Sequence, residues 1–389
     1  MLSRAFHRLP KTPSQLTRSS SSTPRPQSSL PASYYRGGTS RAVFFNQSDL
    51  PTKRTDWAPI FRGVIGSPDP YGRQLDGLGG GISSLSKVCV VGKSTHPAAD
   101  VDYTFAALGI KNTDVDYSSN CGNMVSAVGP FALDSGLFTA QDADAESNSA
   151  VVRIHNTNTG KIVHATFPVV NGEAAASGDL AIDGVSGTAA AIKLDFVEPA
   201  GSRTGKLLPT NGVKDVFDGV EATCVDVANP CVFVKAQDLG VSGTLTPDEI
   251  TGTPGLLDRL DSIRRQAGAK MGLADGPESV PGSVPKIGIV STPERGSGVD
   301  LVVRALSVGQ PHKAVPITVA LALATAARLE GSTVAEVTSA EPVDSSGITI
   351  GHASGSILVG ATFGDDGRLE FATVFRTARR LFEGRIFWK

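Results

Sequence analysis

The chain has 389 residues, 40% of them hydrophobic and 19% charged, and its formal net charge at pH 7 is −2. Such a chain is long enough to form two packed cores. It lacks the basic clusters with interleaved aromatic residues that nucleic-acid binding requires, which excludes that class of partner. The longest apolar run, Val315 to Ala327, is shorter than the roughly 18 to 20 residues of a membrane span, so a membrane partner is not expected either.

The glycine content indicates the fold class, and the cysteine content indicates the redox state of the cellular compartment. Glycine is abundant, at 43 residues, whereas aromatic residues make up only 6%, which favours a strand-rich α/β or α+β protein with many turns. The cysteines show neither the density of a disulfide framework nor the CxxC spacing of a zinc site; they are Cys89, Cys121, Cys224 and Cys231. A reducing compartment is therefore expected.

The first 31 residues differ in composition from the rest of the chain. They are rich in arginine, serine and proline and contain no acidic residue, since the first carboxylate is Asp49. Residues 1–9 can form a short helix with apolar side chains on one side and arginine near the other, as mitochondrial presequences do. We expect residues 1–31 to be a disordered targeting segment and the protein to be mitochondrial. A disordered basic tail or a misassigned start would instead leave the protein cytoplasmic.

Short strands separated by glycine turns are predicted from residue 33 onward. They are Ala42–Phe45, Lys87–Val91, Val151–His155, Ile162–Val170, Ala191–Val197, Val220–Val225, Cys231–Ala236, Lys286–Val290, Leu301–Leu306, Ile348–Ile350, Ile357–Phe363 and Arg368–Val374. The predicted helices are Cys121–Gly136, Pro254–Gly272 and Pro311–Gly331.

The first and third predicted helices indicate a two-fold structural repeat. Each follows a small polar cluster, continues as an apolar stretch and ends at a glycine. We therefore expect an N-terminal domain over residues 32–197 and a C-terminal domain over residues 198–389, each with one buried helix. The segment Glu198–Asn211, rich in proline and glycine, is the expected crossover, and the last strand could return to the first domain.

A glycine-rich loop, Asp76–Gly81, comes directly before a predicted strand. Its Gly80 and Gly81 are candidate substrate-binding residues, because backbone N–H groups without a neighbouring Cβ can approach an anion closely. A tight β-turn is the alternative. A dinucleotide site is rejected, because that fingerprint needs a strand before the glycines and a helix after them.

Two residues are candidates for proton transfer. Lys87 opens an apolar strand; if burial keeps its amine neutral it can act as a base, whereas a solvated lysine is the alternative. Ser119 or Asn120 could cap the first predicted helix and so place Cys121 in its first turn, where the helix dipole favours a thiolate. The other three cysteines lie among valines in strands, as buried inert thiols do.

A series of short motifs extends from about residue 32 to the C-terminus. They are Arg36–Arg41, Asp76–Gly81 with Ser86–Val88, Asn120–Asn123, Arg153–Gly160, Thr204–Pro209, Asn229–Pro230, Pro311–Ala314, Ser354–Gly355 and Arg376–Arg380. In order and spacing they resemble the PrpF-like family of 2-methylaconitate, aconitate and 3-methylitaconate isomerases. The chain departs from the family pattern at Arg41, Ile82 and Ala353, where Lys, Asp and Pro are usual, and these departures leave the substrate open.

The resemblance implies the diaminopimelate-epimerase-like fold. This is an α+β architecture of two similar domains, each with strands wrapped around a central helix, and the active site lies between them. The resemblance also implies that Lys87 and Cys121 are catalytic. Substrate carboxylates would be bound by residues of both domains: Thr39, Ser40, Gly122, Asn123, His312, Lys313, Ser354 and Gly355.

The resemblance, together with these groups, implies a cofactor-independent isomerase that moves a proton and a double bond within an aconitate-type tricarboxylate. Lys87 would remove the proton, while Cys121 would be a second acid/base or would orient the substrate. No flavin, pyridoxal, nucleotide or metal motif is evident. The alternatives are an oxalomesaconate-type keto-enol tautomerase, an amino-acid racemase or epimerase of the same fold, and a non-catalytic binder of small acids. A homodimer is left open.

Overall fold

The computed structural model describes residues 26–118, 120–139, 148–345 and 347–389, and within them 19 strands form one hydrogen-bonded sheet. Six strands in each half pair in the same succession, which is parallel, antiparallel, parallel, antiparallel and antiparallel. In the first half they are β2 (Ser40–Asn46), β3 (Lys87–Lys93), β4 (Val101–Leu108), β6 (Ser149–Asn156), β7 (Lys161–Val170) and β11 (Ile192–Val197). In the second half they are β14 (Asn229–Lys235), β15 (Lys286–Ser291), β16 (Leu301–Ser307), β18 (Ile348–His352), β19 (Gly355–Phe363) and β20 (Leu369–Arg376). This is the two-fold repeat that the sequence predicts.

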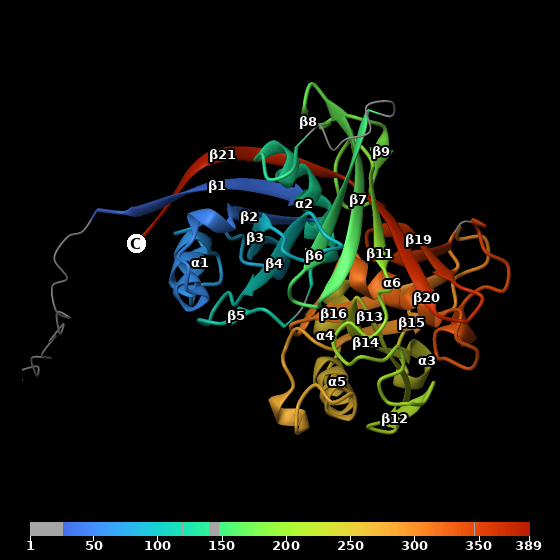
Figure 1. The fold of residues 1–389 in the computed structure, drawn as a ribbon. Helices are drawn as coiled ribbons and strands as arrows, with labels where there is room; N and C mark the ends of the chain where they lie inside the picture. The colour runs from blue at the N-terminus through green and yellow to red at the C-terminus, as the bar shows by residue number, and fades with distance from the viewer. Residues whose placement is uncertain (1–25, 119, 140–147, 346) are drawn as a thin grey trace, which may run out of the picture.

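Pairings between the first and second halves hold the molecule together. β1 (Ser28–Gly37) pairs with β21 (Ala378–Trp388), and the two strands run side by side in Figure 1 although they come from opposite ends of the chain. β20 likewise pairs with β11. Residues 28–31 belong to β1 and not to the expected disordered segment, because their backbone groups pair with β21. The helix expected over residues 1–9 lies outside the described residues.

The two buried helices are α2 (Gly122–Asp134) and α6 (Ile317–Ala326), and they share one hydrophobic core with residues of both halves. Both are shorter than predicted. Pro316 is the N-cap of α6 in extended backbone, so the preceding segment 311–315 is not helical. The reason is that proline has no N–H and disfavours helical backbone in the residue before it. Pro130 lies inside α2.

Two further helices cover the outer sides of the halves. α1 (Trp57–Ile65) packs over a second core in the first half, and α5 (Leu256–Lys270) over a third core in the second half. The remaining helices and strands are β5 (Val115–Asp116), β8 (Glu173–Ala174), β9 (Leu180–Ala181), β10 (Thr188–Ala189), β12 (Asp215–Phe217), β13 (Val220–Val227), α3 (Ala236–Leu239), α4 (Pro247–Gly252) and β17 (Gln310–Pro311). In the described part of the chain, no helix combines the length and apolarity needed to cross a membrane.

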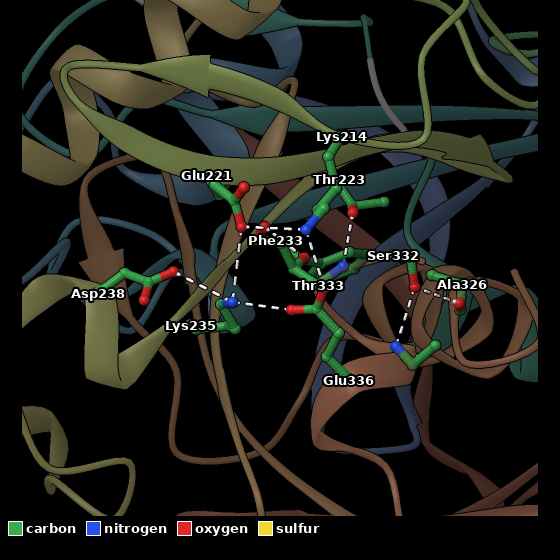
Figure 2. A network of polar contacts seen from close by, with 11 residues as sticks. Lys214, Glu221, Thr223, Phe233, Lys235, Asp238, Ala326, Ser332, Thr333 and Glu336 are labelled. Carbon is green, nitrogen blue, oxygen red and sulfur yellow. Dashed lines mark hydrogen bonds and ion pairs between the residues drawn. The ribbon is translucent and has the colours of Figure 1, made fainter. Parts of the chain in front are cut away.

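A polar network ties the segment after α6 to the sheet (Figure 2). Glu336, in a helical turn that follows α6, accepts hydrogen bonds from Lys214 at 2.8 Å and from Lys235 at 2.7 Å. Thr333 Oγ1 donates to the carbonyl of Phe233 at 3.0 Å. These contacts fix the segment that follows α6 against strand β14 and Lys214.

Candidate active site

A cavity lies at the junction of the halves, where the starts of α2 and α6 meet. Its lining includes the first residues of β3 and β15 and contains no aspartate or glutamate. Seven of the predicted site residues line it: Thr39, Ser40, Lys87, Cys121, Gly122, Asn123 and His312. Residues that the sequence analysis did not single out also line it, among them Ser83, Ser84, Ser283 and Lys286.

Lys87 and Cys121 are in direct contact inside this cavity. Lys87 Nζ is 3.2 Å from Cys121 Sγ and 3.0 Å from Ser40 Oγ, and both reactive side chains are half-buried. The ammonium also lies 6.0 Å from the centre of the Phe105 ring. A lysine and a cysteine at this distance can share a proton, so one can accept a substrate proton while the other donates one.

The start of α2 differs by one residue from the prediction. Cys121 is the N-cap in extended backbone and not a first-turn residue, and its carbonyl accepts the first helical hydrogen bonds. The N–H groups of Gly122 and Asn123 come before the first residue that donates a helical hydrogen bond. They therefore point out of the N-terminal end of the helix, where anions bind. Of the two predicted caps, Ser119 lies outside the described residues, and Asn120 Oδ1 accepts no hydrogen bond within them.

Two glycines allow the close approach of the segments around the cavity. A Cβ on Gly122 would lie 2.7 Å from the Cβ of Ile317, the first residue of α6. A Cβ on Gly38, whose φ is +51°, would overlap Asn123 Oδ1. Asn123 Nδ2 donates to Thr39 Oγ1 at 3.0 Å, which fixes both side chains at the cavity wall.

Asn229 connects the starts of the two buried helices. It is fully buried, accepts from the N–H of Asn120 at 3.1 Å, and donates to the carbonyl of Asn120 at 2.9 Å and to Thr318 Oγ1 at 3.3 Å. We interpret it as a positioning residue. Sequence analysis assigned it no role; its only signal was the Asn229–Pro230 pair in the motif series.

Two buried polar groups that line the cavity from the second half lack a hydrogen-bond partner among the described residues: Lys286 Nζ and His312 Nε2. Burial, reinforced by the charges of Lys87 and Lys286, lowers the pKa of His312 to about 3, so its ring is neutral near pH 7. Burial also lowers the pKa of Lys286. Sequence analysis identified His312 but not Lys286, because a lysine at the start of an apolar strand carries no signal of its own.

Three predicted residues, Lys313, Ser354 and Gly355, lie outside the cavity lining. All three are exposed, and Ser354 Oγ donates to the carbonyl of Lys313 at 3.1 Å. A Cβ on Gly184 would contact both Thr39 and Ser354, so this exposed group borders the site next to Thr39. A substrate-binding role for the three residues stays a prediction.

Gly80 and Gly81 also lie outside the cavity lining, in a loop that hydrogen-bonds to neighbouring segments of the first half. The N–H of Gly81 donates to Gln74 Oε1 at 2.8 Å, and the N–H of Leu78 donates to the carbonyl of Val64 at 2.8 Å. These hydrogen bonds hold the loop against the segments at Val64 and Gln74. Anion binding by Gly80 and Gly81 stays a prediction.

The other three cysteines are buried in strands. Burial raises the pKa of Cys231 to about 12, and it also raises the pKa values of Cys89 and Cys224. Such thiols are poor nucleophiles, which leaves Cys121 as the accessible one. The described residues contain no group of three or more His, Cys, Asp or Glu arranged to hold a metal ion.

Two similar α+β halves, each with one buried helix, define the diaminopimelate-epimerase-like fold, as predicted. The family model described as PrpF protein matches residues 27–389, and the chain belongs to this family. The crystal structure of methylitaconate-delta-isomerase superposes with a TM-score of 0.76 and 39% identity, and the match covers 93% of this chain and 96% of that chain.

Two curated relatives match along nearly their whole length. The 3-methylitaconate isomerase of Eubacterium barkeri is 40% identical, with 93% of this chain and 97% of that protein covered. The 2-methyl-aconitate isomerase of Cupriavidus necator is 37% identical, again with 93% and 97% covered. The chain is therefore an isomerase, as the sequence analysis predicts.

Proposed function

We propose that this isomerase transfers a proton, and with it a double bond, within a small tricarboxylate of the aconitate type. The observation that carries the proposal is the contact of 3.2 Å between Lys87 Nζ and Cys121 Sγ, in a cavity lined by two lysines and no carboxylate. Such a cavity favours a polyanion. The relative named 2-methyl-aconitate isomerase supports this substrate class.

The proposed reaction needs only groups of the chain. Lys87 takes a proton from a carbon next to the double bond, and the electrons of the C–H bond delocalise into the conjugated carboxylate. The N–H groups of Gly122 and Asn123 stabilise the resulting dienolate-like anion. A proton then returns to another carbon of the same system, so the atoms and electrons balance. Cys121 donates that proton or orients the substrate.

The test is proton NMR of the purified protein in deuterated water. The candidates are cis-aconitate, trans-aconitate, 2-methylaconitate, 3-methylitaconate and 4-oxalomesaconate, each supplied separately. We expect at least one aconitate-type acid to isomerise with deuterium incorporated at the carbon that gains the proton. Turnover of oxalomesaconate alone would point to the tautomerase. Binding of every acid without exchange would point to a non-catalytic binder.

An amino-acid racemase or epimerase agrees less well with the site. That reaction on this fold normally uses one cysteine from each half, so that each face of the substrate meets a thiol. The start of α6 carries Pro316 and Ile317 where the start of α2 carries Cys121 and Gly122. The remaining cysteines are buried in strands, so a second reactive thiol is missing from the site.

A further inference from the structure

Lys286 occupies in the second half the position that Lys87 occupies in the first. Each lysine is the first residue of its strand, β15 and β3 respectively. Each strand pairs in parallel with the strand before it and antiparallel with the strand after it in the repeat. Both lysines line the same cavity. The repeat therefore brings one lysine from each half to the active site.

The environment of Lys286 differs from that of other buried cations in the described residues. Lys286 is 7% exposed, and its Nζ has no hydrogen-bond partner there. Arg304 donates to three main-chain carbonyls, and Arg264 forms an ion pair with Asp261. Arg376 has one unpartnered nitrogen but does not line the cavity. Because an unpaired buried ammonium is costly, a purely structural lysine would be expected to have a partner.

The neighbours of Lys286 act on its pKa in both directions. Burial lowers the pKa of Lys286; Cys231 and Cys121 oppose that effect, Lys87 adds to it, and Asp116 opposes it. The cavity lining itself contributes no carboxylate. A substrate carboxylate would supply both the counter-charge and the hydrogen-bond acceptor that the ammonium lacks.

We propose that Lys286 binds a carboxylate of the substrate, so that the lysine of the second half holds the acid while Lys87 of the first half reacts with it. This assignment rests on the proposed function. Lys87 contacts a cysteine that can exchange protons with it, whereas Lys286 has no such contact, so the two equivalent positions have different roles.

The test compares Lys286→Met with Lys235→Met. Lys235 lies on the neighbouring strand β14 but is paired with Glu336 and Asp238 (Figure 2). For Lys286→Met we expect the Kd of tricarballylate, a saturated tricarboxylate, to rise roughly 10- to 100-fold by calorimetry. The KM of the substrate should rise similarly, with kcat within about threefold. The Tm without ligand should be equal or higher. Lys235→Met should lower the Tm and leave the Kd unchanged.

Each contrary outcome has a distinct meaning. An unchanged Kd in Lys286→Met overturns the inference and leaves the proposed function intact, whereas failure of the unsubstituted protein to bind tricarballylate overturns both. A lower kcat with unchanged KM would make Lys286 a proton-transfer residue and overturn the binding role. Failure of Lys286→Met to fold would show a structural role. Lys286→Arg, which keeps the cation, should bind tighter than Lys286→Met, and equal affinity would count against the inference.

Discussion

Lys87 and Cys121 each stand immediately before a run of buried residues. Lys87 is the first residue of β3 and is followed by five buried residues, and Cys121 is the N-cap of α2, whose residues are buried as far as Leu133. Both residues could be identified from the sequence, since a strand start after a glycine loop and a helix start after a polar cluster are readable locally. Their contact could not be predicted, because it depends on the packing of two elements.

Replacing Lys87 by Ala should abolish isomerisation while the protein stays folded. The substitution removes the proposed base but leaves the buried residues of β3 in place, so we expect turnover to fall by at least about 10³-fold. Lys93→Ala, at the exposed far end of the same strand, is the matched control and should retain turnover. Activity is read by the NMR assay and folding by the Tm. Near-normal turnover of Lys87→Ala would remove this residue from the mechanism.

Cys121 should be the most rapidly alkylated thiol of the chain. It is the partly exposed cysteine, it contacts the ammonium of Lys87, and it lies at a helix start, whereas Cys89, Cys224 and Cys231 are buried. Iodoacetamide labelling followed by peptide mass spectrometry measures each site, with and without trans-aconitate. We expect the ligand to protect Cys121. Labelling of a strand cysteine first, or unchanged labelling with every active-site ligand, would contradict the proposed geometry.

Cys121→Ser separates the two roles left open for this residue. A near-complete loss of turnover would mean that the thiol transfers protons. A partial loss with an altered preference among the tested acids would mean that it orients the acid that Lys87 deprotonates.

Lys286 and Asn229 show what residue-level reading of the sequence misses. Asn229 gains its role from bonds to segments 109 and 89 residues away in the chain. The significance of Lys286 comes from burial without a partner. Neither property has a local pattern, so only the folded chain reveals them.

At the scale of elements, most apolar and β-branched segments were predicted, but the buried strand β4, the helix α1 and the strands at the two ends of the chain were not. Nine of the eleven residues of β21 are exposed or half-exposed, so the alternation of buried and exposed side chains along this strand is weak. Its pairing with β1 joins residues more than 340 positions apart, from Ser28 with Trp388 to Gly37 with Ala378. Sequence patterns report burial on one face of an element; they do not report a partner that distant.

Two truncations should differ sharply at this strand pair. Removal of residues 1–25 leaves β1 complete, so we expect the Tm and turnover to stay unchanged. Removal of residues 1–31 deletes four residues of β1, namely Ser28 to Pro31, and exposes their partners on β21, so the Tm should fall by several degrees. Differential scanning fluorimetry measures both variants. An equal Tm for the two would show that this end of the pairing contributes nothing to stability.

Mitochondrial import stays a proposal, which a fluorescent fusion can test. The full-length fusion should enter mitochondria and the fusion lacking residues 1–25 should remain in the cytosol. A full-length fusion found in the cytosol would contradict it.

At the scale of the whole molecule, the repeat supplies equivalent frameworks that the two halves use differently. The strand starts both carry lysine, whereas the helix starts carry cysteine in one half and proline in the other. The cavity has the Lys87–Cys121 contact on the first-half side and, on the second-half side, Lys286, whose Nζ has no hydrogen-bond partner among the described residues. Such asymmetry suits a reaction in which one part of the substrate exchanges a proton while another part is held still.

The same pairings predict that neither half folds alone. Fragment 26–197 would lack β21 and β20, which pair with its strands β1 and β11. Fragment 198–389 would lack β1 and β11 in turn. One hydrophobic core also contains residues of both halves, so each fragment would expose apolar surface.

We therefore expect each fragment to be insoluble, or to lack a cooperative thermal transition, when expressed separately. Coexpression of fragment 26–197 with fragment 198–389 should restore a complex that copurifies, melts cooperatively and isomerises the substrate, since a break at the expected crossover removes one peptide bond and no paired strand. Tagging one fragment and purifying through that tag measures the association. A fragment that folds by itself with a sharp transition would show that the pairings β1–β21 and β11–β20 and the shared core are dispensable. The halves would then be independent domains.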